Sequence, residues 1–139
     1  GELVTGLQQV RTEDGVYNFY FGDEGLMRTG KQSIYDEELG ENQTWFFYTD
    51  GSNKGRGYHG IRDNSVYRQG LRLSADRDLK YAPVELDGIS YLVNASGAIQ
   101  RASSSSKSHT RPELGAGYKD VTDTNDKVWT VDTNGVILP

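Results

Sequence analysis

Large rings alternate with other side chains near the start of the chain, in the segment whose pattern predicts most about the whole. Tyr17, Phe19 and Phe21 would project to one side of an extended segment, because successive side chains of a strand point to opposite faces. A Gly-Asp-Glu-Gly turn follows, and residues 26–29 can return as a second strand. The pattern predicts an aromatic β-hairpin over residues 16–30.

The same pattern recurs when the chain is aligned on the turn glycine. The aligned glycines are Gly25, Gly51, Gly97 and Gly135. Four positions before them stand Phe21, Phe47, Val93 and Val131. Six positions before them stand Phe19, Trp45, Tyr91 and Trp129. Two positions after the glycine come Met27, Ile99 and Ile137, with Tyr67 at that place if Ser65 substitutes for a turn glycine. The second segment breaks this rule at Asn53.

A second glycine precedes each hairpin and is followed four residues later by a β-branched residue. This signature starts at Gly6, Gly30 and Gly117, with a partial copy at Gly70. Repeats of this length imply a stacked array, in which no unit buries its apolar face alone. We therefore expect an all-β fold over residues 2–139, a β-solenoid-like array of about four or five degenerate hairpin units. The expected units are 5–29, 30–57, 58–70, 71–101 and 115–139, with a Ser-rich insertion at 102–112.

Three connecting stretches lack the repeat pattern. Residues 36–42 carry contiguous carboxylates, whose repulsion favours an exposed loop. Residues 71–86 fit either strand ends or a short helical turn near residues 75–80. The low-complexity run at residues 102–110 predicts a flexible or extended segment.

The first unit resembles a known family. Thr5-Gly6-Leu7, Tyr20-Phe21, the turn ending in Gly25 and the run from Met27 to Lys31 are similar to the repeats of cell-wall-binding and choline-binding modules. Those repeats are related to glucan-binding repeats and to the receptor-binding repeats of large clostridial toxins. The resemblance touches about residues 4–100 and 115–138. It implies hairpin repeats that bind polysaccharide on a secreted or surface-attached protein of a Gram-positive bacterium.

One departure from the family pattern concerns choline. The family's Thr-Gly-Trp tryptophan is replaced by Leu7, Lys31, Leu71 and Tyr118. In choline-binding members that tryptophan contributes to an aromatic cage for a quaternary ammonium group. Three of the four residues here have no ring, so the implied choline site lacks part of its cage, while a carbohydrate-facing role remains.

Composition narrows the classes of partner. The chain has 139 residues, a formal net charge of −5 and no cysteine. A negative chain is poorly suited to bind nucleic-acid phosphates or anionic membranes, and no apolar run approaches a membrane span. We therefore expect no nucleic-acid partner, no membrane insertion, and neither disulfides nor zinc–thiolate sites.

Candidate catalytic and metal-binding groups are weakly marked. Carboxylates are numerous but fall in expected turns, and no pair of them is singled out as a glycosidase would require. His59 and His109 lie far apart in the sequence. Residues 120–126 offer oxygen ligands, yet their spacing does not complete an EF-hand loop. We expect no catalytic residue, no metal and no cofactor.

Aromatic rings are the main candidates for ligand contact, since flat rings stack on the apolar faces of sugars. The candidate ligand-binding residues are Tyr17, Phe19, Trp45, Tyr67, Tyr91, Tyr118 and Trp129. The competing interpretation of the recurrent rings is that they pack successive hairpins together.

These patterns predict a non-catalytic binding module for cell-wall or extracellular polysaccharide, located outside the cell or on its surface and attached to a further domain. The alternative is a spacer or protein-interaction segment with no carbohydrate ligand and only internal rings. A third hypothesis, an enzyme, would need a cleft with two carboxylates close together.

Overall fold

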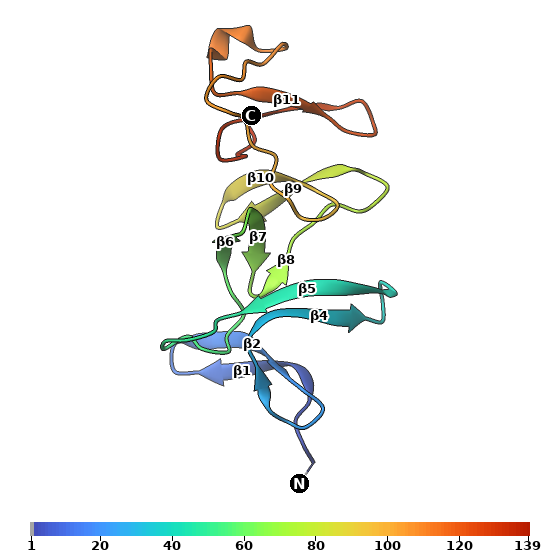
Figure 1. Ribbon diagram of the computed structural model, residues 1–139, viewed down its shortest axis with the longest axis vertical. Coiled ribbons are helices and arrows are strands. Elements are labelled where there is room, and N and C mark those ends of the chain that lie inside the picture. Colours follow the sequence, from blue (N-terminus) through green and yellow to red (C-terminus); the bar gives the residue numbers. More distant parts are fainter. Residues whose placement is uncertain (1) are drawn as a thin grey trace. The chain divides into compact units, whose positions relative to one another are not determined.

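The computed structural model describes residues 2–139, which form short strands and one turn of 3-10 helix (Figure 1). The strands are β1 (Gly6–Thr12), β2 (Gly15–Phe21), β3 (Met27–Arg28), β4 (Gly30–Asp36), β5 (Glu41–Phe47), β6 (Gly60–Arg62), β7 (Ser65–Arg68), β8 (Leu71–Arg72), β9 (Tyr81–Leu86), β10 (Ile89–Asn94), β11 (Lys119–Thr122) and β12 (Val128–Val131). The helical turn is η1 (Pro112–Leu114). The expected all-β class is confirmed, as several small antiparallel sheets of hairpins. Within residues 2–139, no helix has the length and apolar character needed to cross a membrane.

The chain divides into two compact units. Unit 1 consists of the residues up to Gly60 together with Tyr67–Arg72. Unit 2 consists of Ile61–Val66 together with Leu73–Pro139. The β6–β7 hairpin carries the chain from one unit to the other, because the boundary falls within both of its strands.

The first hairpin of unit 1 differs in one respect from the prediction. β2 does continue into a return strand, but this strand is only the two residues of β3. The longer partner of β2 is β1, paired from Gly6↔Phe21 to Thr12↔Gly15 around a two-residue turn. The return strand ends early because Gly30, at φ +74°, redirects the chain into β4.

The second hairpin of unit 1 corrects two predictions. β4 and β5 pair from Gly30↔Phe47 to Asp36↔Glu41, so the acidic segment expected to be a loop contributes paired residues at both of its ends. Only residues 37–40 form the turn, where the acidic side chains reach water. The hairpin expected around Gly51 has no regular return strand, and Phe47 forms an isolated bridge with Gly57 instead.

Aromatic rings make up the core of unit 1. Trp45 and Phe47 are stacked with ring centroids 6.0 Å apart, and Tyr20 stacks on Phe47 at 6.1 Å. Tyr58 meets Phe46 and Tyr67 edge to face, at 5.8 Å and 6.0 Å. Such pairs add to the free energy gained from burying their large surfaces.

The strands that follow extend the sheet of β4 and β5, in the order β4-β5-β8-β7-β6. The expected hairpin near residues 58–70 is confirmed as β6–β7. Its turn is formed by Asp63 and Asn64, at φ +47° and +58°, and not by Ser65. Asp and Asn tolerate this left-handed conformation better than other non-glycine residues, so the turn needs no glycine.

Unit 2 is built on two hairpins with aliphatic cores. β9 and β10 turn at Asp87-Gly88, and their buried face brings Val66, Leu86, Tyr91, Val93 and Ile99 together. β11 and β12 pair from Lys119↔Val131 to Thr122↔Val128, and a second cluster contains Leu92, Val121 and Val131. The undecided stretch 71–86 forms β8 and β9 with a turn near Asp76–Leu79 between them.

The backbone repeats as the aligned glycines predict. Gly25, Gly51, Gly97 and Gly135 all have left-handed φ, at +80°, +75°, +84° and +78°. The upstream glycines, Gly6, Gly30, Gly70 and Gly117, have φ of +74°, +74°, +101° and +97°. The residue four before the turn glycine pairs with the residue two after it in Phe21↔Met27, Val93↔Ile99 and Val131↔Ile137. The second segment departs from this register, as its break at Asn53 indicates.

The Ser-rich segment 102–112 is more ordered than predicted. The Ser103 amide donates to Ser106 Oγ at 3.0 Å, and the Gly117 amide donates to the carbonyl oxygen of Ser106 at 2.8 Å. Ser108 is buried and its hydroxyl donates to the Asp120 carboxylate. Hydroxyl groups satisfy one another and a carboxylate here, so a composition typical of flexible linkers forms a defined loop.

Candidate functional site

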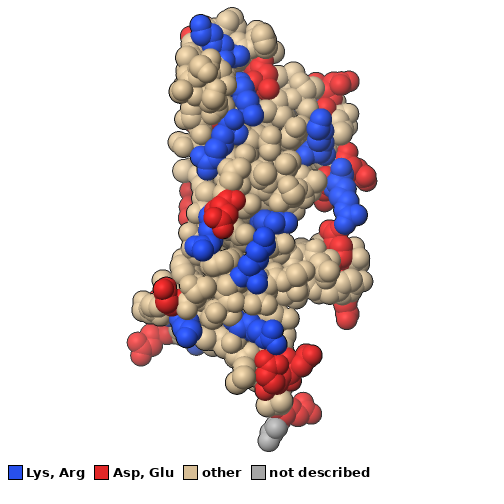
Figure 2. All heavy atoms as spheres, in the orientation of Figure 1, with Lys and Arg blue, Asp and Glu red and all other residues tan. Residues whose placement is uncertain are grey.

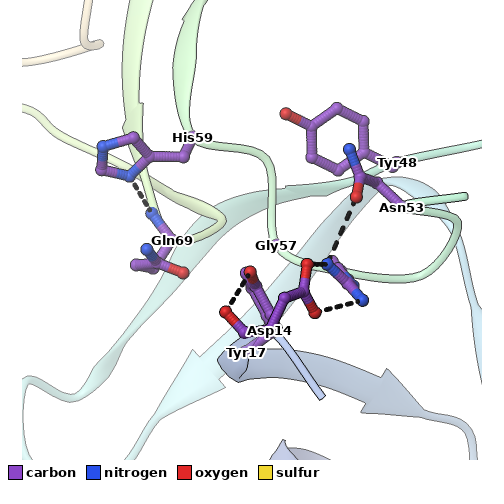
Figure 3. Close-up of a pocket in the computed structure, with 8 residues that line it drawn as sticks. Asp14, Tyr17, Tyr48, Asn53, Gly57, His59 and Gln69 are labelled. Carbon is purple, nitrogen blue, oxygen red and sulfur yellow. Dashed lines mark hydrogen bonds and ion pairs between the residues drawn. The ribbon is translucent and has the colours of Figure 1, made fainter. Parts of the chain in front are cut away.

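Unit 1 contains a small, open pocket of about 150 Å³ (Figure 3). It is lined by Asp14, Tyr17, Tyr48, Asn53, Arg56, Gly57, His59 and Gln69. In the view of Figure 3, His59 and Gln69 lie on one side, and Tyr48 and Asn53 on the other. Rings and hydrogen-bonding groups of several kinds therefore face one concave surface.

The tight turn between β1 and β2 positions the first wall of this pocket. Pairing of Thr12 with Gly15 leaves only Glu13 and Asp14 to reverse the chain. The Thr12 hydroxyl donates to Asp14 Oδ1 at 2.7 Å and orients the carboxylate. Tyr17 follows on β2, with its hydroxyl 3.3 Å from the backbone oxygen of Asp14.

Arg56 joins this wall from the loop that follows β5. Its guanidinium donates to both carboxylate oxygens of Asp14, at 2.9 Å and 3.0 Å, and lies 4.1 Å from the centroid of the Tyr17 ring. The Arg56 guanidinium, with the Thr12 hydroxyl, holds the pKa of Asp14 well below its usual range, and Asp14 raises the pKa of Arg56. The pair therefore stays ionised at neutral pH and holds the Tyr17 ring in place.

Backbone hydrogen bonds close the loop that carries Arg56. The Tyr48 amide donates to the Arg56 carbonyl oxygen at 2.9 Å, and the Gly55 amide donates to the Tyr48 carbonyl oxygen at 2.8 Å. Gly55 has φ +88°, and a Cβ there would collide with the Met27 sulfur. The glycines on either side of Arg56 therefore allow close packing that fixes the arginine.

The opposite wall is held by backbone contacts to Gln69. The Gln69 amide donates to His59 Nδ1 at 3.2 Å, and the Asn18 side chain donates to the Gln69 carbonyl oxygen at 2.9 Å. These contacts fix the backbone of Gln69, and its side chain lies next to the ring of His59 (Figure 3).

Unit 2 contains a larger open groove, of about 610 Å³. It is lined by Thr110, Arg111, Lys127, Val128, Trp129, Thr130, Ile137, Leu138 and Pro139. Trp129 is anchored by its indole N–H, which donates to Asp123 Oδ2 at 3.0 Å. Lys127 Nζ lies 4.0 Å from the centroid of the Trp129 ring. The hydrogen bond from Trp129 and those from the Lys127 and Asn125 amides lower the pKa of Asp123.

A carboxylate next to this groove organises its Thr side chains. Asp120 accepts hydrogen bonds from the Ser108 hydroxyl, the Thr110 amide at 2.9 Å and the Thr130 hydroxyl at 3.1 Å. Burial alone would raise its pKa, but these hydrogen bonds outweigh burial and lower the pKa of Asp120 to about 2. Asp120, considered above as a calcium ligand, instead bonds to amide and hydroxyl donors.

The predicted ligand-binding residues fall into three groups. Tyr17 and Trp129 line the two concave surfaces described above. Trp45, Tyr67 and Tyr91 are buried, with exposed fractions of 9%, 4% and 8%, and pack in the cores. Phe19 and Tyr118 are half-buried and line neither surface; Phe19 lies against Gly55.

Several groups of these surfaces were not among the predicted ligand-binding residues. In unit 1 they are Asp14, Tyr48, Asn53, Arg56, His59 and Gln69, and in unit 2 they are Arg111 and Lys127. Two of them carry a recognisable signal. Arg56 stands between two glycines, and Lys127 precedes Trp129 by two residues, the spacing that places two side chains on one face of an extended chain.

On the face shown in Figure 2, Lys and Arg side chains occur among carboxylates and uncharged surface. Among residues 2–139, no group of three or more His, Asp or Glu side chains is arranged to hold a metal ion. Comparison of the chain with protein-family models, curated proteins and solved structures gave no match.

Proposed function

We propose that this chain is a non-catalytic polysaccharide-binding module of a secreted or surface-attached bacterial protein. Its hairpins would form a β-solenoid-like array that presents sugar-binding surfaces. The observation that carries the proposal is the unit 1 pocket, in which the Tyr17 and Tyr48 rings lie beside the amides of Asn53 and Gln69. Rings supply contact for the C–H faces of a sugar, and amides supply hydrogen bonds to its hydroxyl groups.

The size of the pocket favours a small part of a polymer. Its volume of about 150 Å³ lies below the roughly 300–1,000 Å³ typical of pockets for drug-sized ligands. A single sugar ring at a chain end or branch is the ligand that such a pocket suits. Weak binding of one ring at each site would be strengthened when a polymer reaches more than one site.

Cationic side chains lie over two of the candidate rings, and they affect whether these rings could bind choline. Arg56 lies over Tyr17, and Lys127 lies over Trp129. A quaternary ammonium group would have to compete with a like charge at either ring, which supports an uncharged or acidic ligand.

A spacer or protein-interaction segment is the second candidate, favoured by the burial of Trp45, Tyr67 and Tyr91. Under that hypothesis the repeated rings serve only to pack the hairpins. The two hypotheses differ in what they predict for the surface ring of Tyr17.

The test is a pull-down on purified Gram-positive cell walls, insoluble glucan and choline resin, with soluble oligosaccharide as competitor. We expect retention on wall or glucan, and Tyr17→Ala to weaken it about tenfold, as loss of about 1.4 kcal/mol of contact free energy would. The matched control is Tyr35→Ala, because Tyr35 is 60% exposed and lies outside the pocket. Absence of retention on all three supports, or equal losses in the two variants, would favour the spacer.

A further inference from the structure

We propose that the unit 2 groove is a second sugar site, specific for an acidic sugar residue whose ring carries a single carboxylate, such as a hexuronic acid. The inference rests on the proposed function, because it takes the ligand to be a polysaccharide. It adds the class of sugar that is bound, an acidic one, and places this binding in unit 2.

The charges along the groove are the first argument. Arg111 and Lys127 line it, and among its described lining residues none has an acidic side chain. Lys127 forms no ion pair within residues 2–139, and its ammonium group lies over the Trp129 ring, 4.0 Å from the centroid. Of the nearby carboxylates, Asp120 accepts from three donors, and Asp123 accepts from the Trp129 indole and attracts the Lys127 ammonium without forming a close ion pair with it. The chain thus has a net charge of −5, and yet the charged side chains that line this groove are both cations.

The contacts that hold Arg111 at the groove use only some of its N–H donors. Its Nη1 donates to the backbone oxygen of Pro139 at 2.9 Å, and its Nε lies 3.9 Å from Glu113 Oε2. A guanidinium has five N–H donors, so these contacts fix the group without exhausting it. A planar guanidinium in a fixed position is well suited to a carboxylate.

The apolar part of the groove is the second argument. Val128, Trp129, Ile137 and Leu138 provide an apolar surface beside the two cations. A hexuronic acid carries a C–H face, hydroxyl groups and a carboxylate within one ring. A polyol phosphate polymer carries the negative charge but no ring face, so the apolar surface favours the acidic sugar.

The experiment is a titration of the whole chain with a trigalacturonate and with its carboxyl-reduced, neutral counterpart, followed by tryptophan fluorescence and by calorimetry. We expect the acidic trisaccharide to bind about tenfold more tightly, and this preference to shrink as salt is added, because the ion pairs are exposed and screened. Lys127→Gln should weaken the preference, with Arg111 still in place, and Lys127→Arg should retain it. Lys107→Gln is the matched control, since Lys107 is an exposed lysine of unit 2 outside the groove.

Equal affinity for the two trisaccharides, or an equal effect of the Lys127 and Lys107 changes, would overturn the inference. Tighter binding of a glycerol phosphate polymer than of the trigalacturonate would overturn the assignment to a carboxylate. Tyr17→Ala separates this proposal from the preceding one, because it should weaken retention on wall or glucan and leave trigalacturonate binding unchanged. Retention on neutral glucan without acidic preference would overturn only the present inference, whereas absence of binding to every polysaccharide would overturn both.

Discussion

Unit 1 buries rings at positions where unit 2 buries aliphatic side chains. Phe47 in unit 1 and Val93 and Val131 in unit 2 hold the same place relative to the turn glycine, and all three are fully buried. The stacked and edge-to-face ring pairs observed within residues 2–139 all belong to unit 1. Unit 2 fills its two clusters mainly with Leu, Ile and Val.

The difference shows which part of the repeat is constrained. The left-handed glycines and the register of the short return strands are kept in both units, because a side chain at a positive φ would strain the turn. The buried side chains change from ring to aliphatic, since a core accepts different apolar groups if the space is filled. Buried rings therefore dominate the packing of unit 1, and only rings left at a surface, such as Tyr17 in unit 1 and Trp129 in unit 2, can meet a ligand.

The largest predicted effect is the loss of stability when one buried side chain is truncated in the core of each unit. Phe47→Ala should lower the free energy of unfolding by about 3–5 kcal/mol, and Leu92→Ala by about 2–5 kcal/mol, because each leaves a cavity in close-packed surroundings. Denaturant titration followed by fluorescence measures both, since Trp45 lies in unit 1 and Trp129 in unit 2. Leu39→Ala, at a 59% exposed turn residue, is the control and should stay within about 0.5 kcal/mol of the wild type. A loss at Phe47 no larger than at Leu39 would mean that the ring core of unit 1 is loosely packed.

The second prediction compares two glycines with the same backbone and different surroundings. Gly51→Ala should lower the free energy of unfolding by about 1–2 kcal/mol, because φ is +75° but no atom lies within 4 Å of the added methyl group. Gly135→Ala should lower it by about 1–3 kcal/mol more, because its methyl group would collide with Ile99 and lie 3.1 Å from the Gln100 carbonyl oxygen. Thermal unfolding of the two variants checks the order. Equal losses would show that Ile99 moves aside readily.

The third predicted effect is the pH dependence that Asp120 adds to the stability of unit 2. The pKa of Asp120 is lowered from the usual 3.8 to about 2, so the folded state holds the ionised form more strongly than the unfolded state does. The resulting stabilisation is complete above about pH 4 and disappears as the pH falls towards 2. Asp120→Asn should therefore be less stable than the wild type at neutral pH, with the gap closing in acid. Chemical denaturation at several pH values measures it.

The control for this pH dependence is Asp126→Asn, an exposed carboxylate in the same unit at φ +61°, a conformation that asparagine also adopts readily. Its stability should run parallel to that of the wild type. A gap between Asp120→Asn and the wild type that stays constant from neutral to acidic pH would show that the hydrogen bonds to Asp120 do not depend on its charge.

Much of the backbone could be predicted, and the reason is local. Turn glycines demand particular φ values, and alternating apolar residues demand strands, so Gly97 and Gly135 mark their turns correctly. The errors came where pairing partners compete. β2 could pair with residues on either side of it, and the longer pairing with β1 left only two residues to β3.

The candidate site was predictable only in part. Tyr17 and Trp129 could be named from the pattern of rings, but nothing local distinguishes them from Trp45, whose indole N–H is buried and has no hydrogen-bond partner within residues 2–139. Burial depends on which strands cover a ring, and that is a long-range property. The same holds for Arg56, which meets Asp14 across 42 residues of sequence.

Short-range rules were thus sufficient for the all-β class, the positions of the left-handed glycines and the turns they form, because each depends on a few neighbouring residues. Tertiary folding decided which rings are core and which are surface, and it brought together Asp14, Arg56 and Gln69 around one pocket. It also turned the Ser-rich segment into an ordered loop around Asp120. These outcomes depend on contacts between residues far apart in the chain, whose free energies arise only when the strands have paired and excluded water.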